Sequence, residues 1–190
     1  MIHMPFVVEK GVQNDIVSRL LEDRIIMLHD QIDEVSAQMT IMQLLYLDSI
    51  SNEPIKLYIN SVGGVCTDGL AIIDTMHIIK SPVHTISMGL SASMGALILV
   101  QGDKRFALPN AEIMIHQPLG GAYGQASDIA IQADNILKMK HKLTKMLADN
   151  SFMTYEEMEL MCDRDTYLSA DEALELGLID KIIEYTEKNI

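Results

Sequence analysis

SMGLSASMGALILV, residues 87–100, is the stretch that decides the fold of this chain of 190 residues. Its apolar run is interrupted by three serines and three small residues, Ser87, Ser91, Ser93, Gly89, Ala92 and Gly95. The β-branched run VHTISM (83–88) predicts a strand, Gly89 to Ser91 predicts a turn, and residues 93–101 predict a buried helix. A strand, a Gly-containing turn and a helix in succession are the building unit of an α/β protein.

The same unit occurs once more upstream. IKLYIN (55–60) predicts a strand, SVGG (61–64) a turn, and residues 66–80 a helix. Both turns are rich in glycine and lead into a helix N-terminus, where backbone N–H groups lack partners within the helix. Such groups stabilise a phosphate or the oxyanion of an acyl-transfer reaction.

The rest of the chain continues the alternation of strands and helices. Strands are predicted over 24–28, 106–108, 112–116 and 178–183, and helices over 14–21, 33–48, 127–149, 154–162 and from the SADE capping box at Ser169 to Gly177. QPLGGAYGQ (117–125) carries three glycines and cannot be regular core structure. With no linker and no long repeat, residues 1–190 are expected to form a single α/β domain with mainly parallel strands.

Composition excludes several classes of function. The formal net charge of -13 argues against a nucleic-acid binder, which needs a basic footprint. The apolar stretch 86–100 is too short and too interrupted to span a bilayer. There is no secretory signal pattern, and Cys66 and Cys162 lack metal-binding spacing. These features predict a cytoplasmic protein with no membrane partner and no nucleic-acid partner.

A serine at the entrance to a helix can act as a nucleophile, and Ser93 is placed there. Local sequence alone favours a simpler role for it, as a helix cap or a small residue at a tight crossing. Among the histidines, His116 stands out because it ends the strand EIMIH (112–116), and sites collect at strand ends in α/β sheets. Asp163 and Asp165 both remain open as the carboxylate partner.

Four blocks of sequence together resemble the ClpP family, the proteolytic subunit of the ATP-dependent Clp serine proteases. These are INSVGG (59–64), GLSASMGA (89–96), MIHQPLGG (114–121) and RDTYLSADEALELGLID (164–180). The resemblance runs from about Asp15 to the end of the chain. It implies a ClpP/crotonase-like fold of repeated strand–turn–helix units. It also implies an N-terminal axial segment over 1–14, and a Gly-rich strand and long helix that form a handle over 117–150.

Carried over by position, the resemblance makes Ser93 the nucleophile, His116 the general base and Asp165 the residue that orients His116. The backbone N–H groups of Gly64 and Met94 would bind the oxyanion. The implied reaction is peptide hydrolysis through an acyl-enzyme, with no cofactor or metal in this subunit. ATP would be used by a partner ATPase.

The resemblance also implies an assembly. Two seven-membered rings would stack, either as a homo-oligomer or as a mixed ring with another ClpP, and Arg164, Gly120 and Gly121 would lie at the ring–ring contact. An AAA+ unfoldase such as ClpX, ClpC or ClpA would deliver unfolded protein substrates. Its docking positions would be Tyr58, Ile78, Ile86, Met88, Phe106 and Ile183.

Some residues depart from the family pattern. Val62 replaces the proline of the Asn-Ser-Pro-Gly-Gly turn, Lys56 stands where an aromatic is common, and the N-terminal segment is shorter. Two alternatives therefore stand beside the peptidase. One is a weakly active or structural ClpP paralogue in a mixed ring, and the other is a crotonase-superfamily acyl-CoA enzyme, which needs no Ser/His/Asp set.

Overall fold

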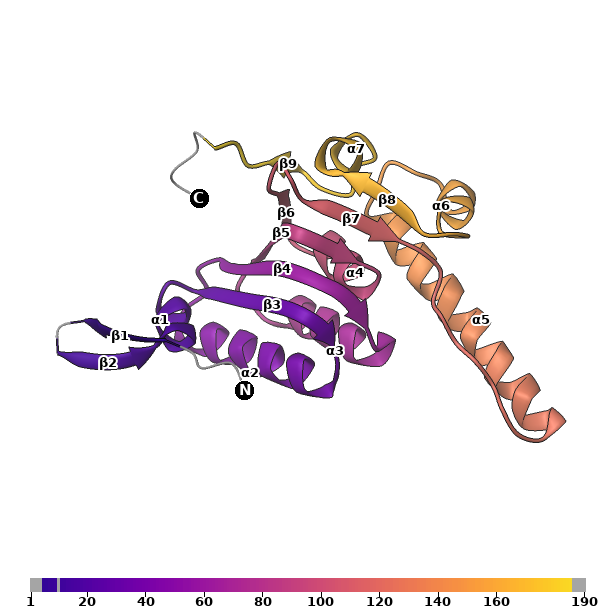
Figure 1. The fold of residues 1–190 in the computed structure, drawn as a ribbon, viewed down its shortest axis with the longest axis horizontal. Helices are drawn as coiled ribbons and strands as arrows, with labels where there is room; N and C mark the ends of the chain where they lie inside the picture. The colour runs from indigo at the N-terminus through magenta and orange to yellow at the C-terminus, as the bar shows by residue number, and fades with distance from the viewer. Residues whose placement is uncertain (1–4, 10, 186–190) are drawn as a thin grey trace.

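The computed structural model describes residues 5–9 and 11–185, so residues 1–4 and 10 of the axial segment expected over 1–14 lie outside it. The described part of that segment is an antiparallel hairpin of β1 (Phe6–Glu9) and β2 (Val12–Asp15), which projects from the rest of the chain (Figure 1). Helix α1 (Ile16–Glu22) follows directly, and the Asp15 carboxylate accepts a hydrogen bond from the Ser18 N–H at 2.9 Å. Of the two candidate N-caps for this helix, Asn14 and Asp15, the structure selects Asp15.

The body of the protein is a seven-stranded sheet in which every pairing except β7–β8 is parallel. Its order is β3-β4-β5-β6-β9, with β7 beside β5 and β8 beside β7. The strands are β3 (Ile25–Ile32), β4 (Ile55–Gly64), β5 (Val83–Ala92), β6 (Lys104–Ala107), β7 (Glu112–Ile115), β8 (Thr166–Ser169) and β9 (Lys181–Ile182). The helices are α2 (Glu34–Ile50), α3 (Cys66–Ile78), α4 (Met94–Val100), α5 (Ala126–Asp149), α6 (Tyr155–Met161) and α7 (Ala170–Glu175). The expected α/β class is confirmed.

One face of the sheet is covered by helices of the same chain. Helices α2, α3 and α4 pack on one another in sequence order and against the strands β3, β4 and β5 (Figure 1). In β4 the residues facing this layer are buried, whereas every second residue, such as Tyr58 and Val62, is half-buried or exposed. Parallel strands are usually buried on both faces, so this alternation leaves the second face of the sheet open within the single chain.

The two Gly-rich segments expected to be turns are parts of strands. Residues 61–64 belong to β4 and pair with β3, and residues 89–92 belong to β5. Each strand is bulged at that point, because Val62 has no partner in β3 and two extra residues of β5 lie between the partners of Ile59 and Ser61. A bulge bends the strand but keeps it in the sheet. The glycines at the bend nevertheless predict a turn when the sequence alone is considered.

The bend in β5 lets one strand serve two neighbours. Before Gly89 it pairs with β6, and after it with β7. Gly89 has φ +72°, and a Cβ there would stand 2.7 Å from the side-chain oxygen of Asn60. That oxygen accepts a hydrogen bond from the Leu90 N–H at 3.1 Å, so Asn60 closes the bulge and Gly89 leaves room for it. Residues 87–100 thus include the point at which β5 changes from pairing with β6 to pairing with β7.

Residues 117–149 form an arm that projects from the sheet (Figure 1). Helix α5 agrees with the predicted 127–149. Its seven-residue apolar repeat is not buried throughout, because Leu143 near the C-terminal end is buried whereas Ile129 near the N-terminal end is exposed. The expected Gly-rich strand is not a strand, because residues 116–123 have no ladder partner among the residues that the structure describes. They lie along α5, with Gly120 against Ile136. None of the helices in the described chain is long and apolar enough to cross a bilayer.

The C-terminal strand is shorter than expected. Only Lys181 and Ile182 of the predicted 178–183 pair with β6. Leu178 and Ile179 are instead buried after Gly177, the residue with φ +75° that ends α7. The apolar run is therefore explained by core packing rather than by a longer ladder.

Arg24 caps the C-terminal end of α2, and we expect its replacement to destabilise the folded protein. Its guanidinium donates to the carbonyl oxygens of Leu47, Ser51 and Glu53 at 3.0, 3.2 and 2.7 Å, and to the Ser81 hydroxyl at 3.1 Å. Carbonyls at a helix C-terminus lack partners within the helix. Arg24→Met keeps the aliphatic bulk and removes these donors, so it should lower the free energy of unfolding by about 2 to 4 kcal/mol.

Urea denaturation followed by circular dichroism measures this loss. Lys145→Met is the matched control, since its ion pair with Asp149 at 2.8 Å joins two exposed side chains on one helix face. That pair should contribute no more than about 0.5 kcal/mol. Equal losses in the two variants would contradict the capping role of Arg24.

Candidate active site

Ser93 stands between β5 and α4 in an unusual backbone conformation. Its φ of 55° lies in the left-handed region that L-residues rarely occupy. It is the N-cap residue of α4, but its hydroxyl makes no capping hydrogen bond. Of the two simpler roles that local sequence favours, a helix cap or a small residue at a tight crossing, the side-chain cap is therefore wrong. The backbone is held by a hydrogen bond of 2.8 Å from the Ser93 N–H to the Met114 carbonyl of the neighbouring strand.

The Ser93 hydroxyl faces His116, which in turn faces Asp165. Nε2 of His116 lies 2.8 Å from Oγ of Ser93, and Nδ1 lies 3.1 Å from Oδ1 of Asp165. The His116 side chain is 12% exposed and that of Asp165 is 59% exposed. A neutral imidazole with its proton on Nδ1 satisfies both contacts, because Nδ1–H then donates to the carboxylate and Nε2 accepts from the hydroxyl. This is the geometry that a nucleophile, a general base and an orienting group require.

Strand register explains why these three side chains meet. In the antiparallel β7–β8 pair, Ile115 lies opposite Thr166. Continuing that register by one residue brings His116 and Asp165 opposite each other. On its other side β7 pairs in parallel with β5, with Met114 beside Ala92, so Ser93 follows at the same end of the sheet. The three residues come from distant parts of the sequence and meet at one edge.

Of the two candidate carboxylate partners for His116, Asp163 and Asp165, only Asp165 hydrogen-bonds to it. Asp163 does not contact His116; its carbonyl oxygen and Oδ1 accept from the Gln117 side-chain amide at 2.9 and 3.4 Å. The Gln117 N–H also donates to the Cys162 carbonyl at 2.7 Å. Gln117 therefore ties the loop that carries Asp165 to the residue next to His116. Sequence reasoning missed this bridge, and its only local signal is an amide directly after the candidate base.

The backbone around Gly63 packs against Ser93. A Cβ on Gly63 would stand 2.7 Å from both the Ala92 carbonyl oxygen and the Cβ of Ser93, and 3.0 Å from the Met94 nitrogen. Gly63 and Gly64 have φ of +86° and +159°. The two positions expected to supply oxyanion donors therefore approach each other, because Gly64 directly follows Gly63 in the chain and Met94 directly follows Ser93.

The other two serines of the opening stretch form a pair of their own. Ser87 and Ser91 are fully buried in β5, and their hydroxyl oxygens lie 2.7 Å apart. A buried hydroxyl needs a hydrogen-bond partner, and each supplies it for the other. Neither is available as a nucleophile.

Neither cysteine competes with Ser93. Both thiols are free, and burial raises the pKa of Cys162 to about 11 and also raises the pKa of Cys66. Since the thiolate is the nucleophilic form, these thiols stay protonated and inert near neutral pH. In the described part of the chain, no group of three or more His, Cys, Asp and Glu side chains is arranged to hold a metal ion.

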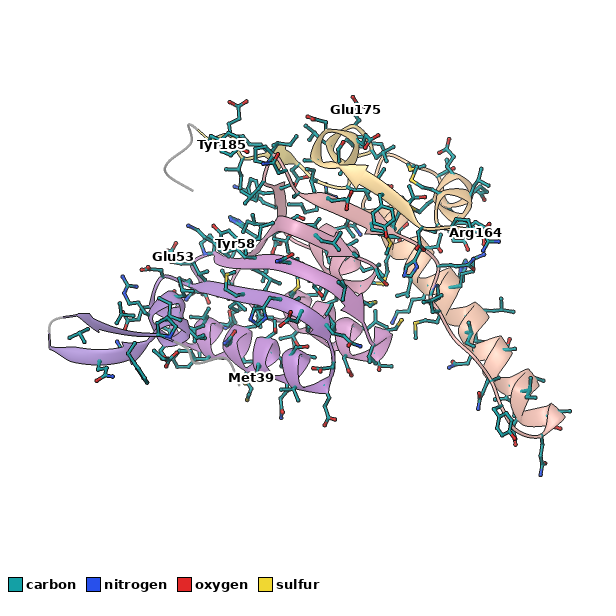
Figure 2. All side chains as sticks on the ribbon, in the orientation of Figure 1. Met39, Glu53, Tyr58, Arg164, Glu175 and Tyr185 are labelled. Carbon is teal, nitrogen blue, oxygen red and sulfur yellow. The ribbon has the colours of Figure 1, made fainter. Side chains whose placement is uncertain are left out.

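The positions expected to meet other subunits lie at the surface or near it. Arg164 is 91% exposed at the edge of the molecule, and Figure 2 shows it pointing outward from the loop between α6 and β8. Gly121 has open space where a Cβ would be. Each of these two positions is therefore accessible in the single chain.

The expected docking positions fall into two groups. Tyr58, Ile86 and Phe106 lie side by side in register across β4, β5 and β6. Met88 comes two residues after Ile86 on the same strand, and Ile86 and Ile183 are buried. Tyr58 stands on β4 on the side away from α2 (Figure 2). Ile78 lies apart from this row, 76% exposed at the end of α3.

Comparison with known families identifies the family of the chain. The family model described as Clp protease matches residues 8–186, which is nearly the whole chain. The chain belongs to the Clp protease family. Membership in the Clp protease family places the chain among ClpP-type peptidases, and it accounts for the mixed α/β fold with a mostly parallel sheet. An acyl-CoA enzyme would not require the alignment of Ser93, His116 and Asp165.

Proposed function

We propose that this chain is the proteolytic subunit of an ATP-dependent Clp protease, a serine endopeptidase that hydrolyses unfolded polypeptides and peptides through an acyl-enzyme. The observation that carries the proposal is the continuous hydrogen-bonded line from Ser93 through His116 to Asp165, at 2.8 and 3.1 Å. Family membership supports the peptidase class, and the geometry supports the assignment of roles.

In the proposed acylation step, Oγ of Ser93 attacks the carbonyl carbon of the scissile peptide. His116 Nε2 takes the hydroxyl proton as the new bond forms, and Asp165 stabilises the resulting imidazolium through Nδ1–H. The imidazolium then gives its proton to the amine of the leaving peptide, and the C–N bond breaks. In this step Asp165 orients the ring and takes no proton from it.

The tetrahedral intermediate carries a negative oxygen, which the backbone N–H groups of Gly64 and Met94 are proposed to bind. Two fixed donors at this point favour the transition state over the flatter ground-state carbonyl. Their supporting observation is the close packing of Gly63 on Ser93 and on the Met94 nitrogen. In deacylation His116 removes a proton from the water that attacks the ester carbonyl carbon. The bond between that carbon and Oγ of Ser93 then breaks, and the proton passes from His116 to Oγ.

The proposed assembly is two stacked seven-membered rings, either homomeric or mixed with another ClpP. Exposed apolar side chains on the arm, among them Ile129, Ile131 and Leu137, support contacts with other subunits. The open face of the sheet, where the half-buried Tyr58 and Phe106 flank the buried Ile86 in register, supports docking of an AAA+ unfoldase there. The partner would use ATP, this subunit would need no cofactor, and the complex would be cytoplasmic.

A fluorophosphonate probe tests the proposal, since it forms a stable bond only with an activated serine. The wild-type protein should be labelled at Ser93, as located by peptide mass spectrometry, and Ser93→Ala should take up no label. Ser91→Ala is the matched control, because it removes a buried serine two residues away and should keep the label. Labelling that survives Ser93→Ala would refute the nucleophile.

The same experiment separates the active peptidase from a structural subunit of a mixed ring. A structural paralogue would form rings of the expected mass but take up no probe. Labelled wild-type protein with slow peptide turnover that rises on addition of a second ClpP would instead identify an active subunit that depends on its ring partner.

A further inference from the structure

We propose that Ser61 is a positioning residue for the oxyanion donor, an inference that rests on the proposed peptidase function. Its hydroxyl oxygen accepts a hydrogen bond from the Gly63 N–H at 3.1 Å. The same hydroxyl donates to the carbonyl oxygen of Asp30 at 2.5 Å. The side chain thus links the Gly63 peptide to the neighbouring strand β3.

The link is needed because the sheet ladder is interrupted at this point. Ser61 lies opposite Asp30 and Gly63 opposite Gln31, so Val62 has no partner in β3. Asp30 has φ of 62°, which also marks an irregular strand. Where a ladder is interrupted, its backbone groups must find other partners. The Ser61 hydroxyl supplies one partner to each strand, at the bulge itself.

Burial makes this hydroxyl a fixed anchor. Ser61 is 2% exposed, and its own backbone carbonyl lies against the start of α4, since a Cβ on Gly95 would stand 3.1 Å from it. A serine oxygen that bonds the N–H two residues ahead forms a compact turn of defined shape. The turn therefore holds its shape without the ring of a proline at position 62, where Val62 is 62% exposed.

The anchored peptide is the one that meets the nucleophile. Gly63 packs so close to Ala92, Ser93 and Met94 that a Cβ on it would stand 2.7 to 3.0 Å from atoms of all three. The next N–H along the chain is the proposed donor of Gly64. If the Ser61 hydroxyl is removed, the Gly63 peptide can rotate, and the Gly64 N–H turns away from the developing oxyanion. Ser61 itself touches neither substrate nor reacting atoms, so it acts only through this turn.

Ser61→Ala tests the proposal with a small ester or peptide substrate. We expect kcat to fall by about 10- to 100-fold with KM little changed, because the lost interaction is made in the transition state. The rate of fluorophosphonate labelling should fall in parallel, since the phosphonate oxygen occupies the same position. Ser61→Cys, which is nearly isosteric but bonds weakly, should give an intermediate kcat, and it keeps the test available if the alanine variant does not fold.

Ser87→Ala is the matched control for a merely structural effect. It too removes a fully buried serine hydroxyl, the partner of Ser91 at 2.7 Å, but from a position that does not reach Gly63. Its thermal midpoint should fall while kcat stays at the wild-type value. An equal loss of kcat in Ser61→Ala and Ser87→Ala, or wild-type kcat in a folded Ser61→Ala or Ser61→Cys, would overturn the positioning role.

The outcomes also separate this inference from the proposed function. If the wild-type protein takes up no fluorophosphonate at Ser93, the peptidase itself fails. If the wild type is labelled and Ser61→Ala is labelled equally fast, the peptidase stands and only the role of Ser61 is lost.

Discussion

Replacing His116 by alanine should lower kcat/KM for a small peptide by about 10⁴-fold or more while leaving the fold intact. Without Nε2 at 2.8 Å from Oγ, the Ser93 hydroxyl has no acceptor for its proton, and a neutral hydroxyl is a weak nucleophile. The fold should survive because His116 lies beyond the end of β7, and within residues 5–9 and 11–185 its side chain hydrogen-bonds only to Ser93 and Asp165. Initial rates with a fluorogenic peptide measure the fall in kcat/KM.

His77→Ala provides the control for a histidine outside the site. His77 is exposed on α3 and should leave peptide turnover at the wild-type level. Circular dichroism and mass in solution confirm that both variants fold and assemble alike. Peptide turnover that persists at the wild-type rate in His116→Ala would rule out the base, whatever the probe reports at Ser93.

The helices could be predicted from the sequence because their signals are local. The apolar spacing over 33–48 and 127–149 predicts α2 and α5 to within two residues at each end. The SADE motif forms the expected capping box between Ser169 and Glu172. In each case the residues that set the boundary lie within one helical turn of it.

The bulged strands could not be predicted in the same way. Glycines at 63, 64 and 89 have positive φ, as in a turn, yet the chain remains in the sheet. Whether such a segment breaks a strand or bulges it depends on the neighbouring strand and on partners such as Asn60. Those are contacts between distant residues, and local pattern carries no record of them.

The site was predictable residue by residue only in part. Local sequence made Ser93 and His116 candidates but left Asp163 and Asp165 equal. The choice follows from the antiparallel register of β7 and β8, which sets Asp165 opposite His116 and leaves Asp163 to Gln117. Register of this kind is set by the packing of the whole sheet, so spacing along the chain could not decide it.

Gly63→Ala should cause the second large loss, a fall in kcat of about 100-fold or more, because it pushes the nucleophile out of place. With φ of +86°, an alanine there is strained by about 1 to 2 kcal/mol before any contact is considered. Its Cβ would stand 2.7 Å from both the Ala92 carbonyl oxygen and the Ser93 Cβ, distances that real atoms do not tolerate. Either β4 or the junction of β5 and α4 at Ser93 must move, and either movement separates the proposed oxyanion donors, the N–H groups of Gly64 and Met94, from Oγ of Ser93.

Gly11→Ala distinguishes the contact at Ser93 from backbone strain alone. Gly11 has a similar φ of +80°, but a Cβ there meets nothing within 4 Å, in a hairpin remote from β5. Gly11→Ala should therefore carry the same strain and keep small-peptide turnover. If both variants lose turnover equally, backbone strain is the cause. If only Gly63→Ala loses turnover, while it still folds and is labelled slowly at Ser93, the close approach of Gly63 is what keeps the proposed oxyanion donors and the Ser93 hydroxyl in place.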